Sequence, residues 1–180
     1  KGAQAVAASI FIALHWTGEI DELKVHIRDF VTNQFEYNMN RTLNEIRPRY
    51  EFDVSCQGSV PEAIIAFLEA DSYEDAIRNA VSLGGDADTQ GAIAGAIAAC
   101  VYPIPEYIIK ECQKRLSDDL LKVVIRFEDY LDNEWQNKIS LPCSCLQPKR
   151  ETVEPEKYVD IIRDNIDLIH KSIKIAVVMV

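Results

Sequence analysis

The sequence predicts an all-α fold, an orthogonal multi-helix bundle. Because the chain begins inside a helical pattern, the bundle is expected to be truncated at its N-terminus. Apolar residues recur at helical spacing along nearly the whole chain, with no repeats and no convincing series of strands. The chain has 180 residues, of which 48% are hydrophobic and 27% are charged. This length and composition fit a globular domain with a substantial core.

Glycine, proline and polar turns divide the helical pattern into segments. The predicted helices cover, in order, residues 2–17, 20–33, 40–47, a segment opened at 59, then 72–83, 89–101, 105–115, a segment opened at 117, and 158–173. Residues 1–140 are expected to form one helical domain. Residues 141–157 look like a polar, proline-containing linker, and 158–180 like a helical tail.

Local signals place the ends of the first helices. Residues 2–17 are apolar on most sides, which predicts a buried helix, and Gly18 is expected to end it as a left-handed cap. The helix over 40–47 stops before Pro48, because the residue before a proline disfavours the α conformation. Residues 50–57 look extended.

Capping patterns mark the next two helices. Ser59 followed by Glu62 matches a capping box, in which the serine caps the helix and the glutamate reaches back to it. Ser72 with Asp75 is a weaker start signal of the same kind, and Gly84 can end that second helix. Glu62 could serve as a general acid only if it faced the aspartates discussed below, and its capping position is the simpler interpretation.

Charge and cysteine content exclude several classes of protein. The formal net charge is -10, which argues against nucleic acid as a partner, since neutralising phosphates needs clustered lysine and arginine. No run of about 18 apolar residues is present, so no membrane partner is expected. The 5 cysteines are scattered and odd in number, which does not suggest a disulfide framework and favours the reducing cytoplasm.

The string GGDADT carries the strongest chemical signal. Gly84 and Gly85 allow positive φ, so the chain can reverse and leave Asp86 and Asp88 in the turn before a new helix. Two carboxylates at i and i+2 can aim at one point, where a hard divalent cation would relieve their repulsion; Thr89 could add a hydroxyl ligand. The alternative is simple helix capping, for which one carboxylate suffices.

The segment GGDADTQGAIAGAIA resembles the C-terminal metal motif of the ADP-ribosylglycohydrolase family. The lead-in VPEAIIAFLEADSYEDAIRNAVSLGGD and the opening KGAQAVAASIFIAL are similar to bacterial members, so the similarity spans roughly residues 1–130. The resemblance implies an all-α enzyme that binds two Mg²⁺ ions, sometimes Mn²⁺. It also implies cleavage of the N- or O-glycosidic bond between ADP-ribose and a protein side chain or small molecule.

The same resemblance assigns roles within the turn. It makes Asp86, Asp88 and Thr89 metal ligands, and it implies that Gly84 and Gly85 let the backbone approach the substrate. The expected partner is therefore an ADP-ribosylated protein or small molecule. The family's transition state is expected to resemble an oxocarbenium ion.

The chain departs from the family pattern in its other ligands. The family's Thr-Asp-Asp cluster does not appear, and TNQF at 32–35 and SDDL at 117–120 are poor substitutes. The expectation is therefore half of a two-metal site, in a chain that is not catalytically competent alone. Two other interpretations stay open: a non-catalytic relative that binds ADP-ribose or a nucleotide, and a structural helical domain in which GGDADT is an interhelical turn.

Overall fold

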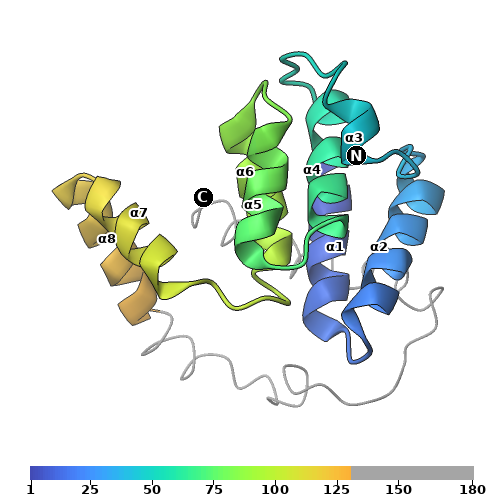
Figure 1. Ribbon diagram of the computed structural model, residues 1–180. Coiled ribbons are helices and arrows are strands. Elements are labelled where there is room, and N and C mark those ends of the chain that lie inside the picture. Colours follow the sequence, from blue (N-terminus) through green and yellow to red (C-terminus); the bar gives the residue numbers. More distant parts are fainter. Residues whose placement is uncertain (131–180) are drawn as a thin grey trace.

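The computed structural model describes residues 1–130, which form eight helices and contain no strand (Figure 1). The helices are α1 (Gly2–His15), α2 (Ile20–Phe35), α3 (Leu43–Ile46), α4 (Cys56–Leu68), α5 (Tyr73–Ser82), α6 (Ala87–Ala98), α7 (Glu106–Arg115) and α8 (Asp118–Tyr130). The all-α prediction is confirmed. The predicted linker over 141–157 and the tail over 158–180 lie outside the described residues.

The centre of the bundle is α4. It packs against α1, α3, α5 and α6, while α1 also contacts α2 and α6 (Figure 1). Every residue of α4 from Ser59 to Leu68 is buried, including Ile64, Ile65 and Phe67. An apolar sequence without a polar face is suited to this central position, because the helix is covered on all sides.

The helices α7 and α8 lie to one side of the bundle, beyond α5 (Figure 1). Within the described part of the chain, α7 has no buried residue. Both helices expose large apolar side chains, namely Tyr107, Ile109, Leu120, Val123 and Ile125. In residues 1–130 no helix is both long enough and apolar enough to cross a membrane.

The first helix ends earlier than predicted, and Gly18 does not cap it. The C-cap of α1 is Trp16, in an extended conformation with φ -72° and ψ 136°. Among residues 1–130, Gly84 and Gly85 are the glycines with positive φ, so Gly18 is not left-handed. The Trp16 indole N–H instead donates to the carbonyl oxygen of Glu19 at 3.0 Å, which stabilises the extended connection to α2.

The predicted capping box at Ser59 and Glu62 is wrong. The fourth helix begins at Cys56, and its N-cap Ser55 accepts a hydrogen bond from the backbone N–H of Gly58 at 3.2 Å. Ser59 then lies in the second turn, and its hydroxyl donates to the Ser55 carbonyl. Both Ser55 and Ser59 are residues that favour an N-cap, and the earlier one caps the helix although no glutamate follows it three residues later.

The fifth helix follows its predicted signals closely. The Ser72 side chain accepts a hydrogen bond from the backbone N–H of Asp75 at 3.1 Å, as expected of an N-cap. The helix ends at Ser82, and Gly84 follows with a φ of +77°. These two ends fix where the chain leaves α5 and therefore where the GGDADT turn begins.

Candidate functional site

The turn between α5 and α6 is built on two consecutive left-handed glycines. Gly84 has a φ of +77° and Gly85 a φ of +64°, a region that other residues adopt only with strain. The turn lies at one end of the bundle, shown at the top of Figure 1, next to the connection that leads into α4. The reversal predicted from the sequence is therefore present.

The sixth helix begins two residues earlier than predicted. Asp86 is the N-cap and Ala87 the first helical residue, so Asp88 and Thr89 lie in the first helical turn rather than before it. Asp86 is half-buried, whereas Asp88 and Thr89 are exposed. The three predicted ligands thus lie within four successive residues at the positive end of a helix, where carboxylates are stabilised.

The two carboxyl groups lie close together. A side-chain hydrogen bond with Asp86 lowers the pKa of Asp88 from its usual value, and the backbone N–H groups of Thr89 and Asp88 act in the same direction. The Asp86 side chain makes no cap hydrogen bond. Capping alone therefore does not account for both aspartates.

No basic side chain neutralises this pair within residues 1–130, where every salt bridge of a lysine or arginine involves another carboxylate. Two ionised carboxylates at such short range repel each other unless a proton or a cation lies between them. A cation bound here would take the place of the proton shared by the two carboxyl groups.

The donor atoms of the turn fit part of a magnesium site. Two carboxylates and a hydroxyl are hard oxygen ligands, the type that Mg²⁺ prefers, and the turn has no histidine or cysteine for a softer metal. In the described residues, no three or more His, Cys, Asp or Glu side chains are grouped so as to hold a metal ion. The turn alone therefore offers fewer ligands than Mg²⁺ usually takes.

Two residues beneath the turn were missed by the sequence analysis. Gln90, fully buried, donates from Nε2 to the hydroxyl of Tyr50, and that hydroxyl donates to the Gly58 carbonyl oxygen at 2.9 Å. The signal for Gln90 was a polar residue on the buried face of α6, in register with Ala94 and Ile97.

The surroundings of Tyr50 show which acidic groups approach it. Burial is the largest cause that raises the pKa of the Tyr50 phenol, and nearby Glu62, Asp53 and Asp86 raise it further. The hydrogen bond from Gln90 acts in the opposite direction. The phenol therefore stays protonated at neutral pH and can donate its hydrogen bond.

Glu62 lies near this phenol instead of at a helix end. It is 5% exposed, and its Oε1 forms an ion pair with the Arg41 guanidinium at 2.6 Å. Its Oε2 is buried and has no hydrogen-bond partner among the described residues. The Arg41 pairing is the contact that explains a buried carboxylate at this position.

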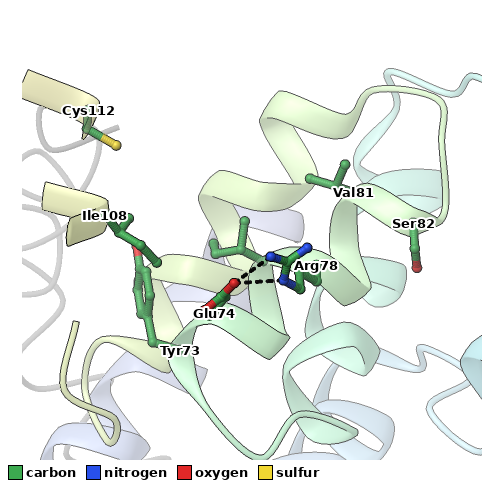
Figure 2. A pocket seen from close by; sticks show the side chains of 8 residues that line it. Tyr73, Glu74, Arg78, Val81, Ser82, Ile108 and Cys112 are labelled. Carbon is green, nitrogen blue, oxygen red and sulfur yellow. Dashed lines mark hydrogen bonds and ion pairs between the residues drawn. The ribbon is translucent and has the colours of Figure 1, made fainter. Parts of the chain in front are cut away.

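A separate groove lies between α5 and α7 (Figure 2). It has a volume of about 700 Å³ and is lined by Tyr73, Glu74, Ile77, Arg78, Val81, Ser82, Ile108 and Cys112. The Glu74–Arg78 ion pair crosses its wall, and the rest of the lining is mainly apolar (Figure 2). None of the predicted ligands lines it, so it is not part of the candidate metal site.

Residues 1–138 match the family model described as ADP-ribosylglycohydrolase, which is more than half of the chain. No curated protein and no solved structure matches this chain significantly.

Proposed function

The chain belongs to the ADP-ribosylglycohydrolase family. We propose that the turn over residues 84–89, called the Asp86 turn below, takes part in the magnesium-dependent hydrolysis of a glycosidic bond of ADP-ribose. The observation that carries this proposal is the close pair of carboxyl groups on Asp86 and Asp88, which no basic side chain within residues 1–130 neutralises. The substrate is an ADP-ribosylated protein side chain or small molecule, and the compartment is the cytoplasm.

Asp86, Asp88 and Thr89 would hold the metal through their side-chain oxygens. When bound, Mg²⁺ supplies a positive charge that orients substrate hydroxyls and lowers the pKa of a water. Gly84 and Gly85 carry no side chain, which leaves the backbone open to a ligand on that side of the turn. The transition state of such a hydrolysis is expected to resemble an oxocarbenium ion.

The turn is proposed to be half of a two-metal site. Its ligands come from a single stretch, and tight binding of Mg²⁺ needs further anionic ligands. In this proposal the family domain is residues 1–140, followed by the linker over 141–157 and the tail over 158–180. The chain alone is then expected to bind metal weakly and to show no hydrolysis.

A second candidate function is binding of ADP-ribose without catalysis. It is favoured by the absence, among the described residues, of a grouping of three or more metal-ligating side chains. For this chain alone neither candidate expects turnover. The two candidates differ once the other half of the metal site is supplied, because only the hydrolase would then release ADP-ribose from a conjugate. Mg²⁺-dependent release of ADP-ribose by this chain would contradict both this candidate and the half-site.

Calorimetric titration of Mg²⁺, with and without ADP-ribose, tests the metal site. The proposal expects the wild-type chain to bind ADP-ribose only when Mg²⁺ is present. The Asp86→Asn, Asp88→Asn double variant should lose this binding. A matched control is the Asp118→Asn, Asp119→Asn double variant, because these aspartates also lie in the first turn of a helix. The control should bind as the wild type does.

The structural alternative predicts a different result. If GGDADT were only an interhelical turn, Mg²⁺ would change neither the thermal stability nor the ADP-ribose binding of any of the three proteins. That outcome would reject the metal site, while family membership, which rests on residues 1–138, would be unaffected.

A further inference from the structure

We propose that Tyr50 and Gln90 are positioning residues that hold the Asp86 turn in place between α4 and α6. The proposal rests on the function assigned above to the turn. Neither residue touches the metal or the substrate in this account. Their role is to fix the backbone from Gly85 onward, on which Asp86 and Asp88 are carried.

The first link is the contact between the Tyr50 ring and the turn. A Cβ atom placed on Gly85 would lie 2.8 Å from Cε1 of the Tyr50 ring and 3.3 Å from the Glu51 carbonyl oxygen. The ring therefore packs directly on the backbone of the residue that precedes Asp86. This close approach is available because Gly85 has no side chain.

The second link is the hydrogen-bond chain from Gln90 through Tyr50 to Gly58. The amide Nε2 of Gln90 can only donate, so the Tyr50 hydroxyl accepts from it and passes its own proton to the Gly58 carbonyl oxygen, 2.9 Å away. Gln90 follows Thr89 in the first part of α6, and Gly58 lies in the first turn of α4. The chain thus ties the beginnings of the two helices together.

Burial of Gln90 favours a role beyond packing. Its side chain is fully buried on a face of α6 that is otherwise apolar, and its Oε1 has no hydrogen-bond partner among the described residues. A buried polar group with an unmet acceptor is less stable than an apolar side chain of the same size. Replacing Gln90 by an apolar residue would lose one specific interaction, the hydrogen bond to the Tyr50 hydroxyl.

The structure supplies a matched control at the opposite ends of the same helices. The Tyr102 hydroxyl, four residues after α6, donates to the carbonyl oxygen of Ala70, just after α4, at 2.9 Å. Tyr50→Phe removes two hydrogen bonds and Tyr102→Phe removes one, and in both cases the lost bonds join segments at the ends of α4 and α6. Only the first lies at the Asp86 turn.

The test combines hydrogen–deuterium exchange with Mn²⁺ binding to the full chain. In metal-free protein, Tyr50→Phe should accelerate amide exchange of the peptide covering 83–90 severalfold, and Tyr102→Phe should leave it unchanged. The affinity for Mn²⁺, followed by the paramagnetic resonance of the free ion, should fall about tenfold in Tyr50→Phe, in line with lost outer-shell contacts. Tyr102→Phe should bind as the wild type does.

Unchanged exchange at 83–90 in Tyr50→Phe overturns the positioning role, as does an equal loss of Mn²⁺ affinity in both variants. If Tyr50→Phe does not fold, Gln90→Met is used in its place, because methionine nearly preserves the side-chain volume. Amide exchange at 83–90 and Mn²⁺ affinity then test the positioning role in that variant. A wild-type chain that binds no Mn²⁺ would overturn the proposed metal site, whereas the exchange data on metal-free protein would still decide the positioning role.

Discussion

At the scale of single residues, the candidate site depends on two glycines that share a conformation and differ in their surroundings. Gly84 and Gly85 both have positive φ, at +77° and +64°. A Cβ atom on Gly84 would meet nothing within 4 Å, whereas one on Gly85 would meet the Tyr50 ring at 2.8 Å. Comparing the two positions separates backbone strain from a steric clash.

We therefore expect Gly84→Ala to destabilise the fold by about 1–2 kcal/mol, the strain of a left-handed alanine. Gly85→Ala should cost about 1–3 kcal/mol more, because the methyl group also displaces the Tyr50 ring and approaches the Glu51 backbone. Urea denaturation of both variants measures the difference. Equal losses would mean that the close packing of Tyr50 on Gly85 is not present in solution.

The residue scale also shows why the candidate site was only partly predictable from the sequence. Asp86 and Asp88 are close in sequence, so their proximity follows from a local turn. Tyr50 and Gln90 are 40 residues apart, and only the packing of α4 against α6 brings them together. No local pattern encodes such a pairing, although a lone glutamine on a buried helix face was a signal that it needed a partner.

At the scale of elements, the contact between α5 and α6 is set by the small residues of α6. A Cβ atom on Gly95 would lie 2.8 Å from Cδ1 of Ile77 on α5 and 3.4 Å from the Tyr73 hydroxyl. A Cβ atom on Gly91, one turn earlier, would meet nothing within 4 Å. Of these two glycines, Gly95 alone lies at the close approach between α5 and α6.

Alanine substitutions at these two glycines should have opposite effects. Gly91→Ala should stabilise the protein by about 0.5–1 kcal/mol, because alanine is the better helix former and has free space here. Gly95→Ala should lose most of that gain and end about 0.5–1.5 kcal/mol below Gly91→Ala, since the Ile77 side chain must leave its position to admit the methyl group. Thermal denaturation decides, and equal stabilisation of both variants would contradict the close α5–α6 contact.

Helix boundaries were the least predictable feature at this scale. Proline and glycine signals worked where the chemistry was unambiguous, as at Pro48 and Gly84. The glycine signal failed at Gly18, and the capping-box signal failed at Ser59, because the actual N-cap is Ser55. The contact from Tyr50 to Gly58 and the ion pair from Arg41 to Glu62 both involve α4 in its longer form. Such long-range interactions are not visible in a local sequence pattern.

At the scale of the whole molecule, a histidine in the bundle makes stability depend on pH. Burial lowers the pKa of His26 on α2, with a smaller opposing effect of Asp29, and its ring packs near that of Trp16. The folded protein thus binds a proton at His26 less readily than the unfolded chain does. Stability should therefore fall as the pH drops below about 6.5, the unfolded value, and continue falling through the lowered folded pKa.

The change in urea midpoint between pH 7.5 and 5.5 measures this effect. It should be smaller in His26→Phe than in the wild type, because phenylalanine keeps an aromatic ring and does not titrate. His15→Phe is the control, since His15 is exposed at the end of α1 and lies against Phe11. If His15→Phe reduced the pH dependence as much as His26→Phe did, the burial of His26 would not be its source.

Cys100 lies just after α6. The rate at which its thiol is modified tests whether α6 unfolds together with the rest of the bundle. Burial raises the pKa of its thiol to about 11, whereas Cys56 and Cys112 are exposed. Compared with an ordinary thiol pKa of 9.0, this raised pKa leaves about 100-fold less of the reactive thiolate at pH 8. Iodoacetamide should therefore modify Cys56 and Cys112 quickly in the native protein and Cys100 at least about 100-fold more slowly.

The urea dependence of this slow reaction identifies the motion that exposes Cys100. If α6 opens only when the whole bundle unfolds, the rate at Cys100 should rise with urea as steeply as the unfolding equilibrium does. Peptide mapping by mass spectrometry follows each cysteine separately. A rate that is independent of urea would instead indicate a local opening at the end of α6. The Asp86 turn at its beginning would then have to be held by α4 and Tyr50 rather than by the whole helix.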